Sequence, residues 1–176
     1  MPATKHHLRR ARLEDVGALE QLIPLSVRIL GSQDYDAGQI EAALLDIFGV
    51  DTQLVRDGTY YVTESEAGLT GCGGWSKRWT SFGGGGAELD PRVDAVRIRG
   101  FFVHPGFARQ GIGSAVLARS ESDAAGYGFR RAELLATLTG ERLYAARGYA
   151  SGDPIEWPLD NDLTITFVPM TKRLGP

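Results

Sequence analysis

The residues from Val103 to Ser114 join the end of an apolar strand to the start of a helix through a glycine-containing loop. Residues 95–103 have the apolar pattern of a buried strand, and helical spacing begins at Gly111. The first N–H groups of a helix have no partner inside it, and the helix dipole makes this end positive. Such a junction binds phosphate groups, so the sequence predicts a phosphate site in this loop.

Gly111 and Gly113 alone are weak evidence for any particular nucleotide. Val116 stands where a dinucleotide fingerprint needs a third glycine, and the Gly-Lys-Ser/Thr of a Walker A loop is missing. The plain alternative is that the two glycines only permit a tight strand-to-helix turn.

Val103-His104-Pro105, a short loop and then Gly-x-Gly-Ser at the start of a helix form a more specific pattern. This pattern resembles the acyl-CoA-binding motif of the GNAT family of N-acetyltransferases. The resemblance implies that the fourth strand splays from the fifth, with the pantetheine arm of acetyl-CoA in the wedge between them. It also implies pantetheine contacts from Phe102 and Val103, and an oxyanion contact from the Val103 N–H.

The same resemblance assigns the pyrophosphate to the loop and the first helical turn. The residues it implies are Arg109, Gln110, Gly111, Ile112, Gly113 and Ser114. The family usually has Arg or Gln three residues before the first glycine, where this chain has Ala108. Binding through main-chain N–H groups tolerates that departure, but the side chain that touches phosphate stays open, with Arg109 as either a phosphate ligand or a solvated loop charge.

A second pattern runs from Thr139 to Tyr149 and resembles the late motif of the same family. Residue by residue, Tyr144 falls on the tyrosine that commonly serves as general acid. Acyl transfer expels a thiolate, and a hydroxyl with a pKa near 10 stays protonated at neutral pH and can return a proton. Thr139 replaces an asparagine common in the family, and the alternative for Tyr144 is a core residue with its hydroxyl at the surface.

The remaining candidates carry weaker signals. An amine acceptor must lose a proton, and the acidic or imidazole groups that could take it are Glu88, Asp90, Asp94 and His104. The aromatic residues that could line the acceptor pocket are Tyr35, Trp75 and Trp79. Cys72 has no histidine partner in the pattern and is read as a small buried cysteine. The histidines at 6, 7 and 104 do not form a metal-site pattern, so no metal is expected.

Composition limits the class of protein. The chain has 176 residues, 43% hydrophobic and 23% charged, with a formal net charge of −3 and one cysteine. We expect one domain over residues 1–176, with the motif-bearing core at about 6–173. The charge argues against nucleic acid as a partner, the short apolar runs against a membrane, and the single cysteine favours the cytoplasm. Homodimers are frequent in the proteins this chain resembles.

The predicted order of elements is β, α, α, β, β, β, α, β, α, β, β. The ranges are strands at 8–11, 59–64, 69–75, 95–103, 131–136, 155–159 and 163–170, and helices near 14–30, 36–48, 111–126 and 140–147. Pro24 is expected to kink or split the first helix. Residues 79–93 are expected to be a lid or a disordered loop. By resemblance, the fold is an α/β fold with a mixed, mostly antiparallel twisted sheet of about seven strands and about four helices, splayed between strands 4 and 5.

The predicted function is direct transfer of an acetyl group from acetyl-CoA to a primary amine of a small molecule or peptide, with Tyr144 as general acid. Two alternatives remain. One is a non-catalytic acyl-CoA sensor, against which the tyrosine at 144 argues. The other is a purely structural α/β domain, which would not bind CoA at all.

Overall fold

The computed structural model describes residues 5–80, 82–83 and 85–175. Its strands are β1 (His7–Arg10), β2 (Tyr60–Ser65), β3 (Gly68–Ser76), β4 (Val96–Val103), β5 (Arg131–Thr137), β6 (Ala150–Ser151), β7 (Ile155–Pro158) and β8 (Thr164–Arg173). Its α-helices are α1 (Val16–Leu30), α2 (Ala37–Asp46), α3 (Thr52–Asp57), α4 (Ile112–Tyr127) and α5 (Glu141–Ala146). Three single-turn helices are η1 (Leu13–Asp15), η2 (Gly31–Gln33) and η3 (Pro105–Phe107).

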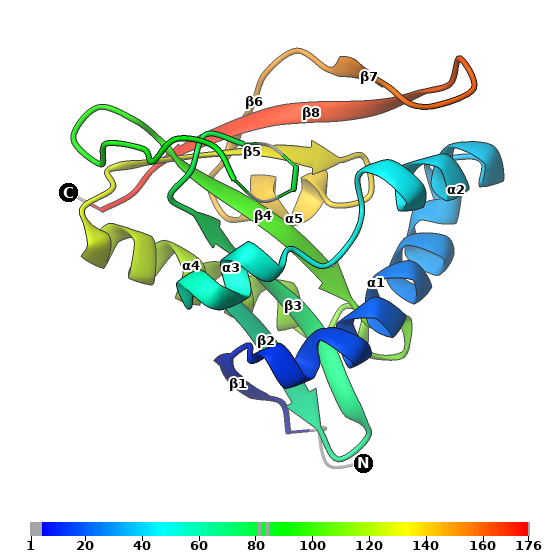
Figure 1. The fold of residues 1–176 in the computed structure, drawn as a ribbon, viewed down its shortest axis with the longest axis horizontal. Helices are drawn as coiled ribbons and strands as arrows, with labels where there is room; N and C mark the ends of the chain where they lie inside the picture. Colours follow the sequence, from blue (N-terminus) through cyan, green and yellow to red (C-terminus); the bar gives the residue numbers. More distant parts are fainter. Residues whose placement is uncertain (1–4, 81, 84, 176) are drawn as a thin grey trace.

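The strands form one sheet in the order β1-β2-β3-β4-β5-β8-β6, with β7 paired to β8. Every pairing is antiparallel except that of β4 with β5, which is parallel. These two strands pair only at Val96 with Ala132 and at Arg97 with Glu133, whereas β4 stays paired to β3 as far as Val103. The predicted mixed, mostly antiparallel sheet with a splay between the fourth and fifth strands is therefore confirmed (Figure 1).

Helices cover both faces of the sheet. The helices α4 and α5 pack on one face, where the core includes Ile98, Val116 and Tyr144. The helices α1, α2 and α3 pack on the other face, around a second core cluster. Figure 1 shows α1 and α3 in front of the sheet and α4 behind it. The sheet therefore lies between two helical layers, each with its own core cluster.

Most predicted elements are present, with local differences. Asp36 caps α2 as expected, because its carboxylate accepts from the Gln39 N–H at 2.8 Å. Pro24 does not split α1, which runs unbroken from Val16 to Leu30, so that part of the prediction is wrong. Two short elements, α3 and β6, were not predicted, and they have only six and two residues.

The segment predicted as a lid or a disordered loop folds back on itself. The Trp79 N–H donates to the Ala87 carbonyl at 2.9 Å, and the Leu89 N–H donates to the Lys77 carbonyl at 2.7 Å. The Phe82 ring lies 4.9 Å from the ring of Trp157, which anchors the segment to β7. Ser81 and Gly84 belong to the same predicted loop and lie outside the described residues.

Candidate active site

A β-bulge in β4 shapes the splayed part of the sheet. The pairing with β3 shifts register between Cys72 and Gly74, and Gly100 adopts a φ of +69°. The Gly100 carbonyl accepts a hydrogen bond of 2.6 Å from the Tyr60 hydroxyl and a longer contact of 3.7 Å from the Cys72 thiol. A bulge inserts one residue into the strand, and glycine reaches the positive φ without strain.

The bulge reverses the side-chain alternation of β4. A regular strand would place Phe102 on the face of Val96 and Ile98, with Phe101 and Val103 on the opposite face, and this expectation is wrong beyond Ile98. In the structure Phe101 and Val103 join the core under α4 and α5, and Phe102 joins the core under α1 and α2. The extra residue at the bulge is the physical reason, because side chains alternate only in a regular strand.

The reversal brings Phe101 to Tyr144. The two rings meet edge to face, with centroids 5.9 Å apart. Gly73 makes this possible, since a Cβ there would lie 2.7 Å from the Phe101 ring. Phe101 was not among the predicted site residues, although a glycine inside a strand pattern is a bulge signal that could have pointed to it.

Tyr144 lies on α5 and is 8% exposed. Its ring also packs edge to face on Tyr149, with centroids 5.8 Å apart. Burial raises the pKa of Tyr144 well above its ordinary value of 10.0. Within the described residues its hydroxyl has no hydrogen-bond partner. The group is therefore a protonated hydroxyl whose donor is free for another molecule.

Beyond Arg97, the backbone edge of β4 that faces the splay has no strand partner. The His104 N–H donates to the carbonyl of Thr70 in β3 at 2.9 Å. Because donors alternate along an antiparallel ladder, the N–H and C=O of Phe102 also face β3, and those of Phe101 and Val103 face the gap toward β5. The Val103 N–H meets the Ser26 hydroxyl of α1 at 3.3 Å. No sequence pattern pointed to Ser26.

The loop after β4 holds a row of unpaired N–H groups. η3 begins with Pro105, and the His104 imidazole caps it by accepting from the Gly106 N–H at 3.0 Å. Within the described chain, none of the backbone N–H groups of residues 109–114 donates a hydrogen bond, and the helical ladder starts with the Ala115 N–H. Arg109 has a φ of +64° and Gly111 one of +80°. Left-handed residues next to a helix start create an anion-binding concavity.

Close packing fixes this loop relative to Tyr144. A Cβ on Gly71 would clash with Ile112, so the glycine lets the first turn of α4 lie against β3. A Cβ on Gly113 would lie 2.9 Å from Leu143, the residue before Tyr144. The Arg147 side chain of α5 also donates to the Ser114 hydroxyl at 3.1 Å. The row of free N–H groups and the tyrosine therefore belong to one packed unit.

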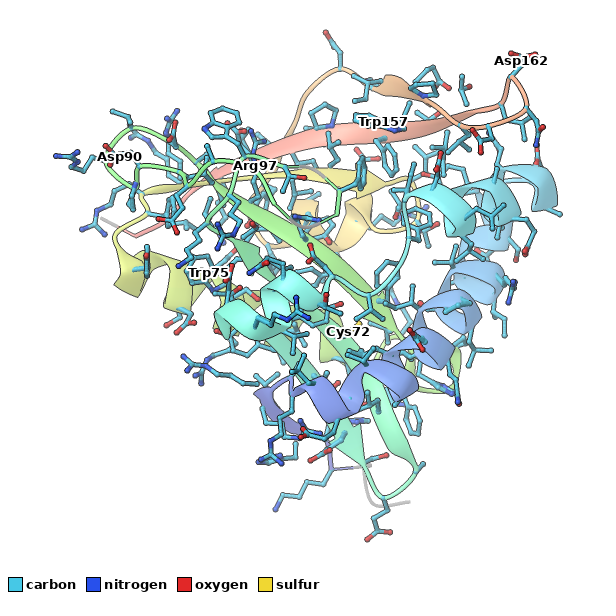
Figure 2. The ribbon with its side chains drawn as sticks, in the orientation of Figure 1. Cys72, Trp75, Asp90, Arg97, Trp157 and Asp162 are labelled. Carbon is cyan, nitrogen blue, oxygen red and sulfur yellow. The ribbon has the colours of Figure 1, made fainter. Side chains whose placement is uncertain are left out.

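The three aromatic residues predicted for an acceptor pocket do not lie together. Tyr35 is 7% exposed, and its hydroxyl donates to the Thr166 carbonyl at 2.7 Å and accepts from the Leu138 N–H at 2.8 Å. Burial raises its pKa to about 12. Trp75 belongs to the core on the α4 side, whereas Trp79 is 55% exposed in the segment after β3. Figure 2 shows Trp75 at the end of β3 away from the splay.

The four candidate bases either lie away from the splay or already make hydrogen bonds within the chain. Glu88 and Asp90 lie in the segment between β3 and β4, at the end of β4 opposite the splay. The neighbouring Arg92 lowers the pKa of Asp90 to about 2. The Asp94 carboxylate accepts from the Asp90 N–H at 2.7 Å. Only His104 lies near the loop, and it is used as the cap of η3.

The model of the acetyltransferase (GNAT) domain matches residues 56–151, which are 96 of the 176 residues. The chain belongs to the GNAT acetyltransferase family. The match spans β4, the loop and α5, so it includes the splay and both predicted motifs. The family prediction made from these motifs is confirmed.

Solved structures share the fold at low sequence identity. A GCN5-related N-acetyltransferase from Rhodopseudomonas palustris is 19% identical, with a TM-score of 0.73 and 99% of each chain covered. The PaiA N-acetyltransferase from Thermoplasma acidophilum, in complex with coenzyme A, is 15% identical, with a TM-score of 0.68 and coverage of 96% of this chain and 99% of that one.

A third structure is a GNAT family acetyltransferase from Brucella melitensis in complex with acetyl-CoA. It is 17% identical, with a TM-score of 0.60 and coverage of 98% of this chain and 90% of that one. No curated protein matches the chain. At these identities the likeness establishes that this GNAT domain has the fold of the three enzymes.

In residues 5–80, 82–83 and 85–175, no helix is both long enough and apolar enough to cross a bilayer. The same residues contain no group of three or more His, Cys, Asp or Glu side chains placed to hold a metal ion.

Proposed function

We propose that this GNAT domain transfers an acetyl group from acetyl-CoA directly to a primary amine of a small molecule or peptide. The observation that carries the proposal is the row of unpaired N–H groups at residues 109–114, ending in the first turn of α4. A pyrophosphate supplies acceptors for several such donors and the negative charge that a helix N-terminus favours. The coenzyme A and acetyl-CoA complexes of the two similar structures named above support this choice of donor.

The pantetheine arm would follow from the loop into the splay. Its amides need alternating donors and acceptors, which the backbone edges of Phe101 and Val103 provide on the side away from β3. The Val103 N–H now meets Ser26 at the long distance of 3.3 Å. That contact is weak enough to be shared with, or replaced by, an acetyl oxygen. We therefore assign pantetheine binding to Phe101 and Val103, in place of the Phe102 and Val103 that the family resemblance implies, because the backbone groups of Phe102 face β3. We assign the oxyanion contact to the Val103 N–H.

Tyr144 would complete the reaction. The amine nitrogen attacks the thioester carbonyl, a C–N bond forms, the C–S bond breaks and the leaving thiolate takes the Tyr144 proton. The proton lost by the attacking amine goes to water and restores the tyrosine by exchange with solvent. Because burial raises the pKa of Tyr144, the hydroxyl is fully protonated at neutral pH. The contact between its ring and that of Phe101 supports this role.

Calorimetric titration of acetyl-CoA into the purified chain tests the first step. Acetate and adenosine diphosphate serve as controls for the two ends of the donor. We expect one-site binding of acetyl-CoA and much weaker binding of either fragment. An absence of binding by a folded sample would leave the glycine loop as a structural turn and would contradict the proposal.

Release of the CoA thiol, measured over a panel of alkylamines, polyamines, amino acids and peptides with free N-termini, tests the second step. With an amine that supports release, Tyr144→Phe should lower kcat by about a hundredfold, the usual contribution of a positioned acid, with little change in acetyl-CoA affinity. Tyr149→Phe is the matched control, since it removes a neighbouring buried hydroxyl that has no partner in the described residues. Equal turnover in the two variants would remove Tyr144 from the mechanism. Tight acetyl-CoA binding without turnover on any amine would favour a sensor domain.

A further inference from the structure

Ser26 is a polar residue on the buried side of α1. The buried residues of this helix are Leu19, Leu22, Ile23, Ser26 and Val27, and Ser26 is 5% exposed. Figure 1 shows α1 beside the arrow end of β4, the end at which Val103 lies. A hydroxyl on an otherwise apolar face costs free energy unless it is hydrogen-bonded, so its partners indicate what it does.

Ser26 does not make the hydrogen bond that a serine inside a helix can make to its own backbone. Such a hydroxyl can donate to the carbonyl four residues earlier. Ser120 of α4 does so, since its hydroxyl donates to the Val116 carbonyl at 2.9 Å. Within the described residues the Ser26 hydroxyl makes one hydrogen bond, in which it accepts from the Val103 N–H at 3.3 Å. Its own proton therefore has no acceptor in that part of the chain.

The Ser26 hydroxyl lies beside the proposed reaction centre. The Val103 N–H carries the proposed oxyanion contact, and α1 packs on both β4 and η3. The Val103 nitrogen and Ser26 Oγ are 3.3 Å apart, so a single oxygen atom can lie within hydrogen-bond distance of both. Two donors that converge on one point are the arrangement that stabilises a tetrahedral oxyanion.

We propose that Ser26 is a second oxyanion donor in the acetyl transfer, an inference that rests on the proposed function. As the amine nitrogen attacks, the π electrons of the thioester carbonyl move onto its oxygen, which accepts from the Ser26 O–H and the Val103 N–H. When the C–S bond breaks, this electron pair returns and the carbonyl forms again. Ser26 keeps its proton throughout.

The surroundings of Ser26 do not favour a covalent role. A serine nucleophile needs a base within hydrogen-bond distance to take its proton. Among the described residues, no imidazole or carboxylate is hydrogen-bonded to Ser26, whose partner is a backbone N–H. The residue is therefore suited to donate a hydrogen bond and not to carry the acetyl group.

The carbonyl carbon of the bound donor reports on this contact before any acceptor amine is identified. The full chain is titrated with acetyl-CoA labelled with ¹³C at the acetyl carbonyl, and the resonance of that carbon is followed by NMR. Hydrogen bonds to the oxygen draw electrons away from the carbon and move its resonance downfield. We expect a downfield shift with the wild type and a smaller one with Ser26→Ala.

Two further variants support the comparison. Ser120→Ala is the matched control, because it also removes a buried helical hydroxyl, but one that donates to its own helix. It should give the wild-type shift. Ser26→Cys keeps the shape of the side chain with a much weaker donor, so it should reproduce the loss seen with alanine.

Turnover and affinity separate a catalytic role from a structural one. With an amine that supports release of the CoA thiol, Ser26→Ala should lower kcat about a hundredfold, as expected for loss of one oxyanion donor. The affinity for acetyl-CoA should change less than about threefold, since the contact strengthens only as charge develops on the oxygen. The affinity for CoA, which has no acetyl oxygen, should not change.

Three results would overturn the inference. If the folded wild type does not bind acetyl-CoA, the proposed function is contradicted and the role of Ser26 falls with it. If the wild type binds and Ser26→Ala has the same carbonyl shift and the same kcat, only the role of Ser26 is contradicted. Equal losses of affinity for acetyl-CoA and for CoA would show that Ser26 merely holds β4 in place.

Discussion

The hydroxyl of Tyr60 donates a hydrogen bond of 2.6 Å to the carbonyl of Gly100 and so ties β2 to the bulge in β4, with β3 between them. The two residues also pack tightly, because a Cβ on Gly100 would lie 2.9 Å from the Tyr60 ring. The bulge decides which face Phe101 occupies, and Phe101 is the neighbour of Tyr144. A hydrogen bond between two residues 40 apart in sequence thereby shapes the edge of β4 that we propose binds acetyl-CoA.

Tyr60→Phe tests this relationship. The variant leaves the Gly100 carbonyl with only the long thiol contact, so the free energy of unfolding should fall by about 1–2 kcal/mol. Because the bulge is then held less firmly, acetyl-CoA should also bind about threefold more weakly or worse. This loss of binding free energy is a fraction of what one hydrogen bond contributes. Urea unfolding and calorimetric titration measure the two effects.

Tyr61→Phe is the matched control for that variant. It removes the neighbouring buried hydroxyl, which donates to Asp123 on the other side of the sheet. It should lower stability by a similar amount and leave acetyl-CoA affinity unchanged. If the two variants affect the affinity equally, the bulge has no special part in binding the donor.

Gly71→Ala should separate α4 from β3. The added methyl group would clash with Ile112, and the helix start that carries the free N–H groups must move to admit it. We expect a loss of about 1–3 kcal/mol of stability, as for other overpacked sites, and weaker acetyl-CoA binding. Thermal unfolding and calorimetry provide the measurements.

Gly17→Ala gives the contrasting case within the same chain. A Cβ there meets nothing within 4 Å, and the residue lies inside α1. Alanine should stabilise the protein by up to about 1 kcal/mol through helix propensity, with no change in acetyl-CoA binding. Destabilisation by this variant would show that the open space at Gly17 is occupied in solution.

The glycine loop and the tyrosine helix could be predicted because their signals are local. Cap, turn and helix start lie within about a dozen residues, where sequence patterns are most informative. The bulge could not be placed in the same way. Gly100 inside the strand is a bulge signal, but the hydrogen bond from Tyr60 that holds its carbonyl joins two residues that no local pattern connects.

Short elements and buried aromatic residues escaped prediction for other physical reasons. The six residues of α3 are too few to show helical periodicity, although Asp51 is an N-cap whose carboxylate accepts from Gln53 at 3.0 Å. Tyr35 and Trp75 have the same residue type whether they line a cleft or fill a core. Only the three-dimensional packing shows that both are buried on opposite faces of the sheet.

Cys72 makes stability depend on pH in the alkaline range. Burial raises the pKa of its thiol from 9.0 to about 12. The native state keeps the proton while the unfolded chain loses it, so this contribution is complete below pH 9 and is lost as the pH rises toward about 12. The slope for one such group approaches about 1.4 kcal/mol per pH unit.

Urea unfolding of reduced protein between pH 8 and 11 measures that slope, with Cys72→Ala as the comparison. The variant should start less stable by about 1 kcal/mol, as expected for a small core deletion, and lose stability less steeply above pH 9. Part of the slope will remain, because burial also raises the pKa of Tyr35 to about 12. Parallel profiles for the two proteins would show that the thiol is not buried in solution.

Arg109 combines a strained backbone with an unpaired charge, and two substitutions separate these properties. Its φ of +64° disfavours any residue with a Cβ, and its side chain has no ion-pair partner among the described residues. Arg109→Gly and Arg109→Ala both remove the charge, whereas only glycine relieves the backbone. The glycine variant should therefore be more stable than the alanine variant by about 1 kcal/mol.

If the guanidinium binds the pyrophosphate, acetyl-CoA affinity should fall about three- to tenfold in both variants, and less so at high salt. Unchanged affinity in both variants would mean that only the main-chain N–H groups of the loop bind the pyrophosphate, and it would identify Arg109 as a solvated loop charge.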